Sequence, residues 1–100
     1  AYTYYKTGKY KSAIVAFKNA LKQYPESKRR EEIMYLIVDS GYRLASNSIS
    51  EKQTDRYLSM LDSYLSFKEE FPESTHIKSL DRMAQQARDY LDRNNKDNNI

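Results

Sequence analysis

The chain has 100 residues, enough for one domain, with 31% charged residues and a net charge of +3 at pH 7. It has no cysteine, which excludes disulfides and thiolate metal sites, and its longest apolar run, residues 33–38, is far shorter than the roughly 20 residues of a membrane-spanning helix. Two glycines and two prolines, with few β-branched residues, predict long helices rather than a sheet.

The first predicted element is a short helix over residues 1–7. Gly8 ends it, because glycine permits the tight turn between antiparallel helices. A second helix is predicted over residues 9–24, where apolar positions recur at helical spacing. Pro25 stops this helix and begins a turn. Together these elements predict a first helical hairpin over residues 1–24.

A second hairpin is predicted over residues 27–71. Its first helix, residues 27–47, is apolar on two sides, which is typical of a helix packed between neighbours. Its second helix, residues 51–71, follows a polar break, and Ser50 with Gln53 has the form of a capping box. The apolar face of this second helix is formed by Tyr57, Leu61, Tyr64, Phe67 and Phe71.

The two hairpins end alike. Tyr24-Pro25-Glu26-Ser27 returns later in the chain as Phe71-Pro72-Glu73-Ser74. We expect the same turn at both places, and Ser27 is a good N-cap for the helix that follows it.

The last predicted helix covers residues 75–92. Its apolar residues lie on one side and its charged residues on the other, which suits a capping helix with a solvated outer face. Residues 94–100 are polar and of low complexity, and we expect them to form a flexible polar tail.

A spaced pattern near the start identifies the repeat type: Gly8, Tyr10, Ala13, Phe17, Ala20 and Pro25. These offsets match the second half of a tetratricopeptide (TPR) repeat, a helical hairpin of roughly 34 residues. We therefore predict an all-α fold, a right-handed TPR-like helical hairpin solenoid with a C-terminal capping helix. Residues 1–93 would form a single domain. The interval between the two prolines exceeds one standard unit, which predicts longer helices and a longer loop.

The aromatic-Pro-Glu-Ser endings, the Gly8 entry and the tyrosine-rich helix faces resemble the BamD family. These are TPR lipoproteins of the machine that inserts β-barrels into the bacterial outer membrane. The segment from Tyr57 to Ser74 carries most of the likeness, which spans roughly residues 1–93 and corresponds to the family's C-terminal repeats.

The resemblance implies a protein–protein interaction scaffold at the periplasmic face of the outer membrane. Its membrane tether would be a lipidated N-terminal cysteine outside this chain. Its partners would be a POTRA domain of the barrel-forming subunit or other lipoproteins of the assembly complex. The short first helix also suggests that upstream TPR repeats of the same chain pack against it. The alternative is a general TPR adaptor that binds a peptide or protein in its concave groove.

No residue pattern indicates catalysis. Glu31-Glu32 and Glu69-Glu70 are neighbours on helices, so their side chains point about 100° apart and do not converge on one cleft. His76 is the only histidine, and no cysteine accompanies it. We expect no enzyme activity, no cofactor and no metal site.

Positive charge is concentrated at one end of the chain. Residues 1–30 hold eight Lys or Arg and one acidic residue, whereas residues 31–100 hold nine and thirteen. This patch is either a solvated convex face or a docking surface for an acidic partner or an anionic surface. Nucleic acid is not expected, because most tyrosines fall at core spacing. The candidate partner-binding residues of the patch are Lys11, Lys18, Lys22, Arg29 and Arg30.

A second candidate site lies on the helix predicted over residues 27–47, which in TPR units lines the concave side. It consists of Tyr35, Val38 and Tyr42, with Asp39 and Arg43 beside them. The stripe either packs against the helix before it or binds a partner, since exposed tyrosine beside arginine is a common hot-spot composition. Asp39 and Arg43 can also pair at the i, i+4 spacing.

Overall fold

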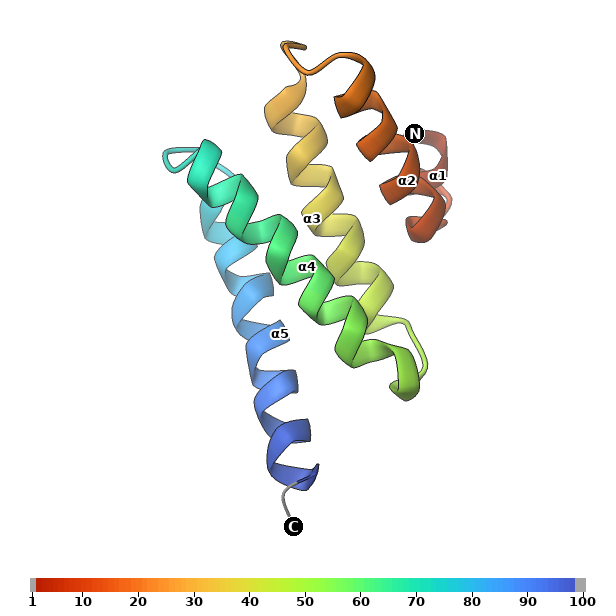
Figure 1. Cartoon of the computed structure of the whole chain (residues 1–100), viewed down its shortest axis with the longest axis vertical. Coiled ribbons are helices and arrows are strands. Elements are labelled where there is room, and N and C mark those ends of the chain that lie inside the picture. The colour runs from red at the N-terminus through yellow and green to blue at the C-terminus, as the bar shows by residue number, and fades with distance from the viewer. Residues whose placement is uncertain (1, 99–100) are drawn as a thin grey trace.

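A computed structural model describes the backbone of residues 2–98 and the side chains of residues 2–94. Within residues 2–98 the fold is five helices without a strand (Figure 1). They are α1 (Tyr2–Lys6), α2 (Tyr10–Gln23), α3 (Arg30–Ser46), α4 (Ser50–Glu70) and α5 (Ile77–Asn98). The all-α fold class is confirmed.

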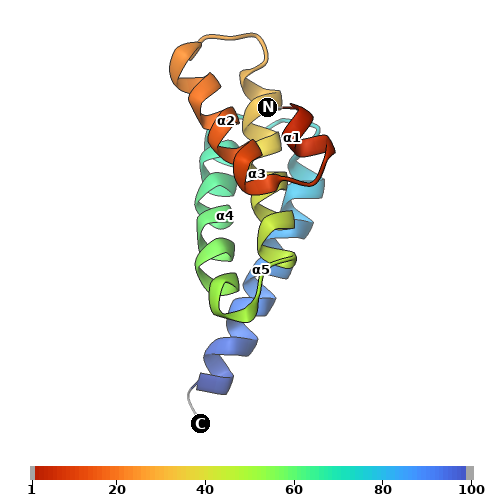
Figure 2. The same ribbon diagram turned by 90° about the vertical axis from the view of Figure 1, so that its right-hand side faces the viewer.

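Helix α3 is the centre of the arrangement. It packs on both α2 and α4, while α5 packs on α4 and α3, and α1 packs on α2. Figure 2 shows α2 and α4 along one side of the molecule, with α1 and α5 toward the other. Antiparallel hairpins stacked in this way bury one another's apolar faces, as in helical repeat proteins.

The apolar core has two parts, and α3 contributes to both. The first part lies between α2 and α3 and contains the buried residues Ala13, Phe17, Ile33, Leu36 and Ile37. The second lies between α3, α4 and α5 and is built from the buried residues Met34, Val38, Ala45, Tyr57, Met60, Tyr64, Phe67, Leu80, Ala84 and Ala87. The two apolar sides predicted for this helix therefore face two different sets of neighbours.

Both glycines occupy positions that favour glycine, each for a different reason. Gly8 has a φ of 77°, a left-handed conformation that suits the turn between α1 and α2. Gly41 lies inside α3, where an added Cβ would come within 3.3 Å of the Cβ of Met60. Glycine thus lets α4 approach α3 closely, and α3 continues through Gly41 without a break, as predicted.

The two Pro-Glu-Ser segments adopt the same turn, as expected from their sequence. The backbone N–H of Ser27 donates to the carbonyl oxygen of Tyr24, and that of Ser74 to the carbonyl oxygen of Phe71, each at 3.1 Å. Each of these bonds satisfies a backbone group beside the helix end.

Each serine side chain also accepts a hydrogen bond in the turn before the next helix. The Oγ of Ser27 accepts a hydrogen bond from the backbone N–H of Arg29, and the Oγ of Ser74 accepts one from that of His76, both at 3.1 Å. The predicted N-cap role of Ser27 is wrong, because α3 begins at Arg30 and its N-cap residue, Arg29, makes no side-chain cap hydrogen bond. Ser27 instead stabilises the turn before the helix.

The predicted capping box at Ser50 and Gln53 is wrong. Helix α4 begins at Ser50 itself, and the residue before it, Ile49, makes no side-chain cap. The Nε2 of Gln53 instead donates to the carbonyl oxygen of Ala45 at 3.0 Å. That carbonyl lies in the last turn of α3 and needs a donor, so Gln53 joins α4 to the end of α3.

Helix α5 is longer than predicted. It continues to Asn98 rather than ending near residue 92, so the backbone of residues 94–98 is helical. Residues 99–100 and the side chains of residues 95–98 lie outside the described part of the chain. The flexibility expected of the tail, residues 94–100, therefore stays a prediction.

Two carboxylates join neighbouring helices through hydrogen bonds. The guanidinium of Arg30 donates to both oxygens of Glu70, at 2.5 and 2.9 Å, and this bonding lowers the pKa of Glu70. The hydroxyl of Tyr64 donates to Asp81 and lowers the pKa of that carboxyl group. The folded chain therefore stabilises the ionised form of each carboxyl group relative to its protonated form.

We expect a modest acid destabilisation from these two groups. Because their folded pKa values lie below the ordinary 4.5 and 3.8, their stabilisation is present above those values and is lost as pH falls through the folded ones. Solvent screens both groups, so each contributes less than about 1 kcal/mol. The double variant Glu70→Gln/Asp81→Asn should lose less stability than the wild type between pH 7 and pH 3 in urea melts. Equal losses would contradict this assignment.

Candidate functional site

Two residues of the predicted α3 stripe are buried and do not reach a partner. Val38 is 0% exposed and Asp39 is 1% exposed. Val38 belongs to the core between α3, α4 and α5, and Asp39 is covered by α1. The prediction that these two residues contact a partner directly is therefore wrong, because neighbouring helices already cover them.

Asp39 instead fixes α1 to α3. Its Oδ2 accepts a hydrogen bond from the hydroxyl of Tyr5 at 2.5 Å and another from the Nε of Arg43 at 2.9 Å. The i, i+4 pair expected from the sequence thus forms. Burial and the Asp39 hydrogen bond raise the pKa of Tyr5 to about 12, so the phenol keeps its proton and remains a donor.

The two tyrosines of the stripe contact residues that come much later in the chain. The ring of Tyr35 stacks on the ring of His76 with centroids 3.8 Å apart, and the Nε2 of His76 lies 3.4 Å from the Oε2 of Glu32. The hydroxyl of Tyr42 donates to the side chain of Gln86 on α5. Tyr35 and Tyr42 therefore pack against the core between α3, α4 and α5, and Tyr35 also packs against the core between α2 and α3. Partner binding by Tyr35, Tyr42 and Arg43 stays a prediction.

Three lysines of α2 are exposed: Lys11, Lys18 and Lys22. Their spacing places them along one side of the helix, and we call them the lysine ridge. Arg29 is also exposed, whereas Arg30 is bound to Glu70, which offsets its charge. Of the five predicted basic residues, Arg30 is thus the least suited to attract a partner.

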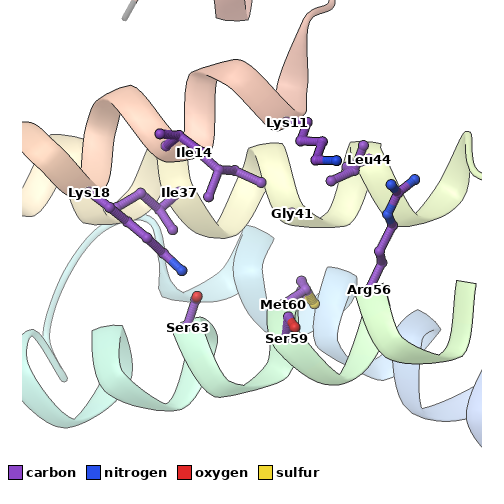
Figure 3. A pocket seen from close by; sticks show the side chains of 11 residues that line it. Lys11, Ile14, Lys18, Ile37, Gly41, Leu44, Arg56, Ser59, Met60 and Ser63 are labelled. Carbon is purple, nitrogen blue, oxygen red and sulfur yellow. The ribbon is translucent and has the colours of Figure 1, made fainter. Parts of the chain in front are cut away.

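A groove runs beside the lysine ridge, between α2 and α4, and α3 forms its floor (Figure 3). Its apolar lining includes Ile14 of α2, Ile37 and Leu44 of α3, and Met60 of α4. The hollow has a volume of about 220 Å³. A second hollow of about 270 Å³ shares part of this lining and extends the groove along α2.

The groove is a candidate site that the sequence analysis missed. Its α4 wall carries Arg56, Ser59 and Ser63, with Ser66 in the second hollow. The available signal was a run of small polar residues at helical spacing beside an apolar face. That signal becomes meaningful only once α2 and α4 are known to lie on the same side of α3.

No group of three or more metal-ligating side chains occurs within the described residues. None of the helices described is both long and apolar enough to cross a membrane.

The fold defines the chain as an all-α helical repeat protein whose units are antiparallel hairpins joined by Pro-Glu-Ser turns. A family model described as outer membrane lipoprotein, YfiO, matches residues 1–96. The chain therefore belongs to this BamD-like family of outer membrane lipoproteins, and the resemblance inferred from the sequence is confirmed. Comparisons with curated proteins and with solved structures give no match.

Proposed function

We propose that the chain is a protein–protein interaction scaffold in the assembly of outer-membrane β-barrels, acting at the periplasmic face of that membrane. The family match over residues 1–96 carries the proposal. In this role the chain binds and positions other proteins and catalyses no reaction. A lipid anchor outside these residues tethers it to the membrane, and upstream TPR repeats of the same protein pack against α1.

The partner we propose is a POTRA domain of the barrel-forming subunit or another lipoprotein of the assembly complex. The contact surface is the lysine ridge together with Arg29. None of the three ridge lysines has an ion-pair partner within residues 2–94, so their charge is free to act on a partner. Unpaired positive charge of this kind speeds encounter with an acidic surface.

A general adaptor with a peptide in its concave groove is favoured less. That function would use the side of α3 that carries Tyr35 and Tyr42. Both tyrosines already contact residues near the C-terminal end, His76 and Gln86, so little of their surface is left for a peptide. Both hollows described above lie on the α2–α4 side of α3 instead.

The double variant Lys18→Glu/Lys22→Glu should associate more slowly with the periplasmic part of the barrel-forming subunit. We expect the association rate constant to fall by about tenfold at low salt and its salt dependence to flatten, because long-range attraction is lost. The dissociation rate constant should change less. Surface plasmon resonance at several salt concentrations measures both rate constants.

The matched control is Lys78→Glu/Arg82→Glu, which makes the same change in net charge on exposed residues of α5. It should leave the association rate constant near the wild-type value. If the control slows association as much as the ridge variant does, the effect comes from net charge and the lysine ridge is not the docking surface.

A further inference from the structure

The groove between α2 and α4 presents apolar surface that no element of residues 2–98 covers. Ile14 and Leu44 are partly exposed along it and Val15 at its edge is 57% exposed, whereas Ile37 and Met60 form its nearly covered base at 6% and 1% exposed. An apolar side chain of a partner would displace water from this lining, which is favourable. The small side chains of Ser59 and Ser63 keep the α4 wall open.

Positive charge flanks this apolar floor from both sides. Lys11 and Lys18 extend from α2 toward α4, and Arg56 extends from α4 toward α2 (Figure 3). The Nη1 of Arg56 donates to the Oγ of Ser48 at 2.5 Å, which helps to orient its guanidinium. Asp62, at one end of the second hollow, is the one acidic residue that lines either hollow.

The groove is long enough for a short segment of a partner. From Arg56 to Ser66 the α4 wall spans eleven residues, and the ten helical steps between them correspond to about 15 Å. A helix of about ten residues covers that length. The serine hydroxyls can donate to and accept from the backbone of such a segment.

We propose that this groove binds an acidic segment of a protein partner, with large apolar side chains in the groove and carboxylates beside Lys11, Lys18 and Arg56. The positive charge on both walls and the exposed apolar side chain of Val15, with the partly exposed Ile14 and Leu44, support this occupant over a neutral or basic one. The proposal rests on the proposed function, because it names how a partner that approaches the lysine ridge is held. The ridge then mainly sets the association rate constant, and the groove mainly sets the dissociation rate constant.

Three synthetic peptides test the groove directly. The first alternates leucines with glutamates, the second has serines in place of the leucines, and the third has lysines in place of the glutamates. Titration into the isotope-labelled chain should give amide shifts around Ile14, Leu44 and Ser63 for the first peptide only. If the leucine-free peptide bound as tightly as the leucine–glutamate peptide, charge alone would account for binding and the proposal would be overturned.

Two variants test the groove from the protein side. Ser63→Phe fills the hollow and leaves the charge unchanged, whereas Arg56→Glu reverses charge without filling it. Each should weaken binding of the leucine–glutamate peptide by about tenfold or more, as for central residues of an interface. The control Thr54→Phe adds the same ring to an exposed residue of α4 outside the groove and should bind as the wild type does. Wild-type affinity in both groove variants would contradict the proposal.

The same variants separate the two proposals when the partner is the periplasmic part of the barrel-forming subunit. Ser63→Phe should speed dissociation by about tenfold with little change in association. If the ridge variant slows association and Ser63→Phe changes nothing, the docking function stands and the groove proposal fails. If the peptide binds the groove but neither variant affects the subunit, the groove stands and the proposed function fails.

Discussion

Replacing Phe67 with alanine should lower the free energy of unfolding by about 3–5 kcal/mol. Phe67 is 0% exposed and lies in the core between α3, α4 and α5, where its ring contacts that of Phe71 at a centroid distance of 5.4 Å. Truncation removes this contact surface and leaves a cavity, because the three helices around it cannot shift far enough to fill the space. Urea melts of the wild type and the variant measure the difference.

Leu65 supplies the control on the same helix. Its side chain is 54% exposed, so Leu65→Ala should change the free energy of unfolding by less than about 1 kcal/mol. A loss below about 1 kcal/mol for Phe67→Ala would place Phe67 outside the core and contradict the packing of α4.

Replacing Asp39 with alanine should lower the free energy of unfolding by about 2–3 kcal/mol. The change leaves the hydroxyl of Tyr5 without its acceptor and the guanidinium of Arg43 without its partner. Arg43 is half exposed and water can solvate it, which keeps the loss below that of a fully buried pair. Because Asp39 is the side chain that joins α1 to α3, the amides of α1 should also exchange faster.

Asp39→Asn and Tyr5→Phe give the matched comparison. Asparagine keeps an acceptor for the hydroxyl of Tyr5, so its loss should be smaller than that of alanine. In a double-mutant cycle of Tyr5→Phe with Asp39→Ala, the two losses should be less than additive, since both remove the same hydrogen bond. Additive losses would mean that this hydrogen bond contributes nothing to the attachment of α1.

The turns and helices were predictable because their causes are local. Proline stops a helix, and a serine two residues later accepts a backbone hydrogen bond, so Pro25 and Pro72 mark the same turn at two places. Apolar spacing predicts helices from the residues themselves, and the helix starts fell within three residues of the expected positions.

The partners of each side chain were not predictable, because they depend on which helices meet. The spacing of Tyr35 and Asp39 places them on a side of α3, but their contacts come from elsewhere: His76, just before α5, stacks on Tyr35, and Tyr5 of α1 bonds to Asp39. Gln53 fits a capping box in its own helix, yet the carbonyl of Ala45 on the neighbouring helix takes its hydrogen bond. The groove between α2 and α4 exists only in three dimensions and leaves no contiguous sequence signal.

The most direct test of docking through the lysine ridge is site-specific photocrosslinking of the full-length lipoprotein in cells. A photoreactive residue replaces Lys22 on the ridge or, for comparison, Asp92 on α5, both of which are exposed. Our account predicts crosslinks from position 22 to the barrel-forming subunit and none from position 92. Crosslinks from position 92 without any from position 22 would place the docking surface on the other side of the molecule.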